Sequence, residues 1–313
     1  MALPLDNPNQ ESEGVSVPLE DLVTRHLVRQ GGDFRLADVD PGDTNGFEDK
    51  KAGRKRLGAA IERMAELQSQ LYAQDRWAAL FIFQAMDAAG KDGTIKHVMS
   101  GVNPQGCQVH SFKAPSKEEL DHDYLWRCAR ALPERGRIGI FNRSHYEEVL
   151  VVRVHPEYLV HQRLPGGLVT ESIWRERFED IRGFERHLTR NGVIIRKFFL
   201  HISRDEQKRR FLSRMEEPEK HWKFSSADVA EREHWDDYMA AYEEAIRETS
   251  TPEAPWVVVP SDRKWYARVV VAETIVRTLE SLNLSYPVIS QEAREDMAVA
   301  RTALEGDSTI DPR

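Results

Sequence analysis

The chain has 313 residues, of which 31% are charged and 40% are hydrophobic, and its net charge at neutral pH is −8. These proportions are ordinary for a globular protein, and the acidic balance argues against general nucleic-acid binding. No apolar run approaches the ~20 residues of a membrane helix, and the polar, acidic N-terminus is not typical of a signal peptide. The two cysteines, Cys107 and Cys128, are too few for a disulfide framework and are expected to be free thiols in a cytoplasmic protein.

The N-terminal residues 1–48 mix Pro, Gly, Asp and Asn with little periodicity, which predicts an extension that wraps the domain or stays mobile. The main domain is predicted to span residues 49–285. Its first helix is expected over 47–74, where apolar residues recur every three or four positions. The apolar run over 77–83 then predicts a central parallel strand that is buried on both faces.

Further apolar runs predict strands over 108–112, 137–141, 193–202 and 256–260, with helices between them. Capping boxes open two of these helices, at Ser116–Glu119 and Ser203–Glu206. A long helix is expected to begin at Ser225 or Ser226, and the acidic tail over 286–313 is expected to be peripheral. Alternating strands and helices predict an α/β fold in which helices sandwich a parallel sheet, with ligands bound beyond the carboxyl ends of the strands.

The loop Asp87–Gly93, written DAAGKDG, follows the first predicted strand directly and precedes a helix. Backbone N–H groups around Ala89–Gly93 would form a nest for an anion at the start of that helix. Gly90 and Gly93 allow the backbone to approach phosphate oxygens, and Lys91 would reach them as a point charge. The loop therefore predicts a phosphate site, and a plain turn is the alternative.

A carboxylate inside such a loop would repel phosphate, so Asp87 makes chemical sense chiefly if a divalent cation lies between them. Mg²⁺ favours one or two carboxylates together with waters and substrate phosphates. The hydroxyl ligand usual in these loops is replaced here by Asp92. Asp87 is therefore predicted to take over the metal-binding role.

Polar residues also follow the strand predicted over 137–141, where Asn142-Arg143-Ser144-His145 begins. If this strand lies beside the first one, Arg143 would clamp phosphate and Asn142 would occupy the place of a metal ligand.

A third basic feature is the stretch Arg182–Arg214, which holds ten Arg and Lys residues against three acidic residues. A local basic stripe on an acidic protein favours a bounded anionic ligand, although a solvated helix face would explain Arg182 and Arg186.

Four motifs in this order resemble polyphosphate kinase family 2. They begin at Asp87 (DAAGKDGTIKH), Gly101 (GVNPQG), Phe112 (FKAPS) and Phe141 (FNRSHYEEVL), and the similarity covers roughly residues 45–285. The asparagine form of the last motif is similar to the branch that accepts AMP as well as ADP. The resemblance implies a P-loop-kinase-like catalytic domain with a helical lid over roughly 204–250. It implies phosphoryl transfer between inorganic polyphosphate and a nucleotide (AMP, ADP or ATP) with Mg²⁺ or Mn²⁺, and a homo-oligomer.

Carried onto this sequence, the resemblance implies catalytic roles for Asp87, Lys91 and Arg143. The implied phosphate-binding residues are Ala89, Gly90, Gly93, Thr94, Lys113, Lys208, Arg209 and Arg210. Many members carry Asp where this chain has Asn142, which is a weaker, neutral metal ligand, and Glu147 is a candidate for the missing charge. The alternatives are an ATP-dependent nucleotide or small-molecule kinase of the same fold and a non-catalytic polyphosphate-binding protein.

Overall fold

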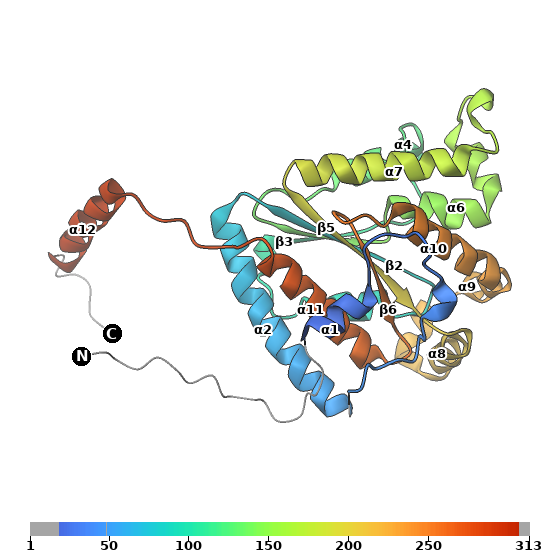
Figure 1. Cartoon of the computed structure of the whole chain (residues 1–313), viewed down its shortest axis with the longest axis horizontal. Helices are drawn as coiled ribbons and strands as arrows, with labels where there is room; N and C mark the ends of the chain where they lie inside the picture. The colour runs from blue at the N-terminus through green and yellow to red at the C-terminus, as the bar shows by residue number, and fades with distance from the viewer. Residues whose placement is uncertain (1–18, 48, 307–313) are drawn as a thin grey trace.

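A computed structural model of the protein describes residues 19–47 and 49–306, and a six-stranded sheet forms its centre (Figure 1). The strand order is β1-β6-β5-β2-β4-β3. The strands are β1 (Leu27–Val28), β2 (Ala78–Ala85), β3 (Cys107–Ser111), β4 (Ile138–Asn142), β5 (Val193–His201) and β6 (Trp256–Pro260). The last five are parallel, so the predicted parallel sheet is confirmed. The two-residue strand β1, too short for a pattern, pairs antiparallel with β6.

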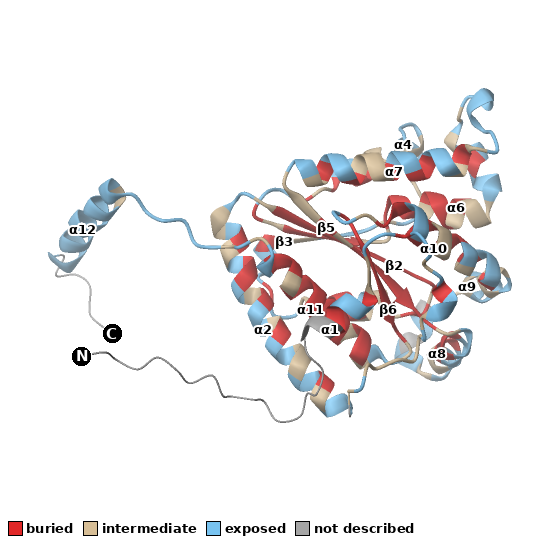
Figure 2. Ribbon diagram, viewed as in Figure 1, coloured by how far each residue is buried: buried red, intermediate tan, exposed pale blue. Residues whose placement is uncertain are grey.

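Helices cover both faces of the sheet, as predicted (Figure 1). One face carries α1 (Leu19–His26), α2 (Lys50–Gln74), α3 (Lys91–Val98) and α11 (Lys264–Glu280), and the other carries α6 (Val151–Val154), α7 (Ile173–Arg190) and α10 (Trp235–Thr249). The strand β2 is buried along all eight residues, and Figure 2 shows the central strands as the most buried part of the molecule. This enclosure explains why β2 reads as a continuous apolar run instead of an alternating one.

Further helices lie between these elements or follow them. The remaining α-helices are α4 (Lys117–Leu120), α5 (Trp126–Arg130), α8 (Arg204–Glu216), α9 (Ser226–Ala230) and α12 (Gln291–Gly306). The 3-10 helices are η1 (Leu36–Asp38), η2 (Pro104–Gly106), η3 (His145–Val149), η4 (Pro156–Gln162), η5 (Gly166–Leu168), η6 (Pro218–Lys223) and η7 (Glu231–His234). Both predicted capping serines, Ser116 and Ser203, accept a hydrogen bond from the backbone N–H three residues on.

The single long helix predicted from Ser225 or Ser226 is wrong, because the chain forms α9, η7 and α10 in succession. Local propensity does not explain the break. At its centre, Glu231 accepts hydrogen bonds from Tyr238 at 2.8 Å and pairs with His155 at 3.0 Å. These contacts, one of them distant in sequence, fix the 3-10 turn. The helix α7 lies between β4 and β5, where the sequence predicts a helical segment, and it buries the apolar stripe of Ile173, Phe178, Ile181 and Leu188.

The two ends of the described chain differ. Residues 19–47 pack on the domain: α1 contacts α11, and the backbone N–H of Leu36 donates to Glu243 at 2.8 Å. Residues 1–18 and 48 of the predicted extension lie outside the described residues. In the predicted acidic tail, α12 is exposed and stands apart from the domain (Figure 1), and residues 307–313 lie outside the described residues.

The position of β2 creates a switch point in the sheet. The chain runs from β2 to β3 and back to β4 on one side, then crosses to β5 and β6 on the other side. The register pairs Phe83 with Asn142 and Ala85 with Leu200. The loops that follow β2, β4 and β5 therefore emerge together at one edge, which is where ligands bind in sheets of this kind.

The helix α2 packs on α11, which begins next to this edge of the sheet. Substitutions at two glycines of α2 test how tightly the two helices pack. A Cβ at Gly53 would overlap the Trp265 ring, whereas a Cβ at Gly58 would meet nothing within 4 Å. We expect Gly53→Ala to lower the free energy of unfolding by about 1–3 kcal/mol. The control Gly58→Ala should raise it by about 0.5–1 kcal/mol because alanine favours the helix. Urea denaturation measures both, and similar effects of the two changes would contradict this packing.

Candidate functional site

The loop after β2 leads into α3 and leaves the N-terminus of this helix uncapped by any side chain. Gly90 is the N-cap of α3, with a φ of 104°, and no side chain caps the helix there. Because the first N–H groups of a helix have no partner within it, they are available to an anion. Ala88 also has a left-handed φ of 63°. The N–H of Ala89 is already used, since it donates to Met86 O at 3.2 Å.

Lys91 is folded back against its own loop. Its Nζ donates to the carbonyl oxygen of Ala85 at 3.2 Å. Burial lowers the pKa of Lys91, and nearby Arg143 lowers it further, although Asp87 and other carboxylates oppose the effect. An incoming phosphate would reverse this penalty, because an anion close to an ammonium group favours its charged form.

Arg143 joins the loop after β4 to the loop after β2. Its Nη2 donates to Asp87 Oδ1 at 3.1 Å, and its Nη1 donates to Glu147 Oε2 at 3.1 Å. The Glu147 carboxylate, despite an opposing effect of burial, raises the pKa of Arg143 above its ordinary value, and Asp87 adds to it. The backbone of Arg143 has a φ of 64°, and its N–H donates to Phe83 O at 3.0 Å. The guanidinium is therefore fixed between two carboxylates.

Asn142 has a partner that the sequence did not reveal. Its amide Nδ2 donates to Asp92 Oδ1 at 2.8 Å and lies 3.4 Å from Ser111 Oγ. An aspartate at position 142 would place a second carboxylate against Asp92. The amide therefore complements the unusual acidic residue of the loop.

Arg210 of α8 clamps the backbone of the loop directly. This buried side chain pairs with Glu206 at 2.6 Å. Its guanidinium donates to four backbone carbonyl oxygens, those of Ala88, Ala89, Ser261 and Asp262. The neighbouring Gln207 donates to Asp87 O at 2.9 Å. The segment α8 thus fixes the backbone around Asp87 before any ligand binds.

These groups surround a cleft of about 640 Å³. Asp87, Gly90, Gly93, Thr94 and Asn142 all contribute to its lining. Among the described residues, seven cationic side chains line it against two carboxylates: Lys91, Lys113, Arg143, Arg210, Arg214, Lys264 and Arg268. We call this space the basic cleft, and its excess of cations suits a polyanion.

The three adjacent cations Lys208–Arg210 do not share one face of α8. Only Arg210 lines the basic cleft. Lys208 and Arg209 are exposed on the outer side of α8, and Arg209 pairs with Glu206. Successive helix residues point about 100° apart, so three neighbours cannot face one ligand. Farther back in the basic stripe, Arg182 binds Glu248 on the other face of the sheet.

Two cleft cations, Lys264 and Arg268 of α11, carried no recognisable signal in the sequence. Trp222 of η6, an aromatic residue that could stack a base, also lines the cleft, and its ring system is exposed. Arg268 Nε has no hydrogen-bond partner among the described residues, and burial lowers the pKa of this side chain. Lys264 and Arg268 are spaced by one helical turn, which places them on the same face of a helix. Such pairs are too common in helices to identify these two as residues of a binding site.

A second cavity of about 220 Å³ adjoins the basic cleft and shares Asp87 and Arg143 with it. Its other carboxylates are Glu147, Asp228 and Glu231. Its walls include three tyrosines: Tyr158, Tyr238 and Tyr242. We call it the aromatic cavity. It differs from the basic cleft in charge, and the Asp87–Arg143 ion pair lies where the two meet.

The carboxylates fit a divalent cation held mainly by its substrate. Asp87 and Asp92 place hard oxygen ligands among the cations of the basic cleft. Within residues 19–47 and 49–306, no cluster of three or more His, Cys, Asp or Glu residues is arranged as a metal site. A site with one or two carboxylates, completed by phosphate oxygens and waters, is how Mg²⁺ binds in phosphoryl-transfer proteins.

Within residues 19–47 and 49–306, no helix is both long and apolar enough to span a bilayer.

Fold and site together define a phosphoryl-transfer protein of the α/β class, and comparisons with known proteins specify its family. A family model described as polyphosphate kinase 2 matches residues 47–286. An ADP-polyphosphate phosphotransferase of Rhodopseudomonas palustris is 55% identical over 259 residues, which cover 82% of this chain and 90% of that protein. An AMP/ADP-polyphosphate phosphotransferase of Meiothermus ruber is 47% identical over 264 residues, which cover 84% of this chain and 95% of that protein.

Solved structures agree with the sequence matches. The crystal structure of polyphosphate kinase 2 from Arthrobacter aurescens superposes with a TM-score of 0.79 at 43% identity and covers 87% of this chain and 95% of that one. The chain therefore belongs to the polyphosphate kinase 2 family. The predicted P-loop-kinase-like fold and the predicted kinase class are both confirmed.

The Arg210 clamp generates a prediction about the loop. We expect Arg210→Ala to lower turnover by at least about 100-fold, since four carbonyl oxygens and Glu206 lose their shared partner. Arg209→Ala removes the same charge one residue away, where the side chain is 70% exposed, and should retain near-normal turnover. Steady-state kinetics of both variants, with thermal melts, would decide. Equal losses in the two variants would contradict the clamp.

Proposed function

We propose that this enzyme transfers a phosphoryl group between inorganic polyphosphate in the basic cleft and a nucleotide whose phosphate enters from the aromatic cavity. The observation that carries the proposal is the junction at Asp87 and Arg143, which both spaces share. A chain with charge on every link matches a cleft rich in Arg and Lys. A nucleoside, which offers a ring to stack and hydroxyls to bind, matches tyrosines and carboxylates.

In the forward direction an oxygen of the acceptor phosphate attacks the terminal phosphorus of the polymer. A new P–O bond forms, the bridging P–O bond to the next phosphate breaks, and the polymer leaves one unit shorter. The protein contributes positioning and charge neutralisation to such a reaction. Arg143 would hold the acceptor phosphate, and Lys91 would hold the transferred group. The N–H groups at the start of α3 would bind its oxygens.

A divalent cation, Mg²⁺ or Mn²⁺, would neutralise phosphate charge when it is bound. Asp87 would hold it, with Asp92 and the Asn142 amide oxygen nearby. Glu147 is already paired with Arg143, and we propose that this carboxylate orients the arginine and contributes to the metal only through its charge. The cation would also relieve the repulsion between Asp87 and an entering phosphate.

The segment 204–250 would serve as the helical lid. Ser213, Arg214 and Trp222 from this segment line the basic cleft, and Gln207 and Arg232 line the aromatic cavity. Movement of the segment would expose both spaces together. The two free cysteines favour a cytoplasmic enzyme. The family resemblance implies a homo-oligomer, either a dimer or a tetramer.

We propose that both AMP and ADP are acceptors. The two relatives above are named for ADP alone and for AMP with ADP, and both are similar over most of this chain. The direct test is to incubate the purified protein with polyphosphate, Mg²⁺ and each of AMP, ADP, GMP and GDP, and then to separate the nucleotides. ATP consumption without a response to polyphosphate would favour an ATP-dependent kinase. Metal-independent polyphosphate binding without transfer would favour a binding protein.

The proposed roles of Asp87 and Lys91 are tested by substitution. We expect Asp87→Asn and Lys91→Ala each to lower turnover by at least about 100-fold, because each removes a charge that acts on the transferred group. The fold should persist, since both side chains lie at the cleft surface. Lys96→Ala on the same helix, outside the cleft lining, is the matched control. Near-normal activity of either site variant would contradict the assignment.

Arg268 is expected to bind polyphosphate and not the acceptor. Arg268→Ala should raise the KM for polyphosphate by about ten-fold or more, since a charge-assisted hydrogen bond contributes roughly 1.5–3 kcal/mol. The KM for AMP or ADP should change little, because Arg268 lies outside the aromatic cavity. The control Arg263→Ala removes the same charge from an exposed position beside the cleft. An increase confined to the nucleotide KM would contradict the proposed orientation of the substrates.

A further inference from the structure

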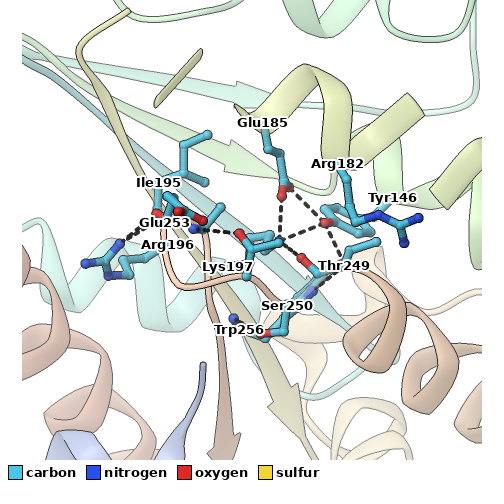
Figure 3. A network of polar contacts seen from close by, with 12 residues as sticks. Tyr146, Arg182, Glu185, Ile195, Arg196, Lys197, Thr249, Ser250, Glu253 and Trp256 are labelled. Atoms are coloured by element: carbon cyan, nitrogen blue, oxygen red, sulfur yellow. Dashed lines mark hydrogen bonds and ion pairs between the residues drawn. The ribbon is translucent and has the colours of Figure 1, made fainter. Parts of the chain in front are cut away.

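Figure 3 shows a polar network in which Tyr146, Lys197 and Glu185 lie together, and Tyr146 follows Arg143 by three residues in the chain. Lys197, at the middle of β5, donates to Glu185 Oε2 at 2.6 Å, to Thr249 O at 2.8 Å and to Tyr146 Oη at 3.0 Å. All three donors of the ammonium group therefore have acceptors. The Tyr146 hydroxyl donates to Glu185 Oε1 at 2.8 Å and lies 2.9 Å from Thr249 Oγ1.

The network is sealed from solvent. The Lys197 side chain is 0% exposed and that of Glu185 is 2% exposed. Burial and the paired cation act in opposite directions on Glu185, and the net effect of Lys197 and His145 keeps its pKa below the ordinary value. Burial also lowers the pKa of Lys197, and Glu185 opposes that effect. With Nζ and Oε2 2.6 Å apart, the two groups form a buried salt bridge. Replacing a buried ion pair with apolar side chains is often neutral or stabilising, so stability alone does not account for it.

The network is joined to Arg143 through the backbone, because Tyr146 follows Arg143 by three residues. Ser144 Oγ accepts from Gln84 of β2 at 3.2 Å and from the N–H of Tyr146 at 3.2 Å. Tyr146 then anchors η3 in the network. Arg143 itself has a left-handed φ of 64°, which costs a non-glycine residue free energy and persists only where surrounding contacts enforce it. Those contacts are the β2 pairing on one side and Tyr146 on the other.

The same network holds a wall of the aromatic cavity. Thr249 is the last residue of α10, and the same helix carries Tyr238 and Tyr242 of that cavity. Glu185 lies on α7. One buried ion pair therefore connects β5 and α7 to the Arg143 turn and to the helix that faces it across the cavity.

We propose that the Lys197–Glu185–Tyr146 network is a positioning device that fixes the guanidinium of Arg143 between the two substrates. The Tyr146 hydroxyl is the group that connects the ion pair to the segment carrying Arg143. This inference rests on the proposed function of Arg143. None of the three side chains touches a substrate, so each acts through Arg143. The network sets how often the arginine occupies the geometry needed for transfer.

Tyr146→Phe is the deciding variant, because it removes one hydroxyl and leaves the Lys197–Glu185 ion pair intact. Its control is Tyr266→Phe, which removes the hydroxyl of another fully buried tyrosine, one that is hydrogen-bonded to His26 at 2.8 Å and lines neither the basic cleft nor the aromatic cavity. We expect Tyr146→Phe to lower kcat about ten-fold, with KM values for polyphosphate and nucleotide changed less than about two-fold. Tyr266→Phe should retain the wild-type kcat, and thermal melts should show similar small losses in both.

A double-mutant cycle separates positioning from general destabilisation. If Tyr146 acts through Arg143, then Tyr146→Phe should cause no further loss of kcat in an Arg143→Ala background. A full additional ten-fold loss in that background would overturn the inference. Wild-type kcat in Tyr146→Phe, or an equal loss in Tyr266→Phe, would overturn it as well.

Failure of the proposed function has a different signature. A wild-type protein that forms no product from polyphosphate and any tested nucleotide would refute that function. An active wild-type enzyme with an unaffected Tyr146→Phe variant would refute only the network's role. Lys197→Met is unsuited to this decision, because it leaves the Glu185 carboxylate buried without a cation and destabilises the fold directly.

Discussion

Mutual repulsion among cations is the constraint on which this site depends. Seven Lys and Arg side chains line the basic cleft among the described residues, and they must be held together without their anionic ligand. Carbonyl oxygens and carboxylates of the protein bind these cations in place of the anionic ligand. Arg210 binds carbonyl oxygens and Glu206, Arg143 lies between two carboxylates, and Lys91 is turned onto Ala85 O. Positive charge is thus arranged in advance, so substrate binding need not reorganise it, which is the condition for strong electrostatic catalysis.

The strand-following loops were predictable because their position depends on the sheet alone. A buried apolar run followed by Gly90-Lys91 fixes where a phosphate loop must begin. The parallel pairing of β2 with β4 then brings Asp87 and Arg143 within 3.1 Å. No tertiary information beyond the strand order was needed. By contrast, the direction of each cation on α8 depends on how that helix is rotated, which is why Arg210 faces the cleft and Lys208 does not.

The remaining parts of the site come from elements with no local signature. Arg268 lies on a helix whose sequence indicates only core packing, and its place in the cleft lining arises from the position of that helix beside Gly93. The break between α9 and α10 depends on Glu231 meeting His155, 76 residues away in sequence. Side-chain partners at such separations are properties of the assembled fold. A single sequence therefore predicts the position of the loop after β2 well and the walls of the cleft poorly.

The charge of the loop also explains why an amide is suitable at position 142. Asp92 occupies the place of a hydroxyl residue and adds a negative charge to a cleft that must attract a polyanion. A carboxylate at 142 would face Asp92 at hydrogen-bond distance, and one of the two would have to take up a proton or share a cation. Asn142 instead donates to Asp92 at 2.8 Å. The pair keeps the number of carboxylates in the cleft at two among the described residues, so the excess of cations that polyphosphate requires is preserved.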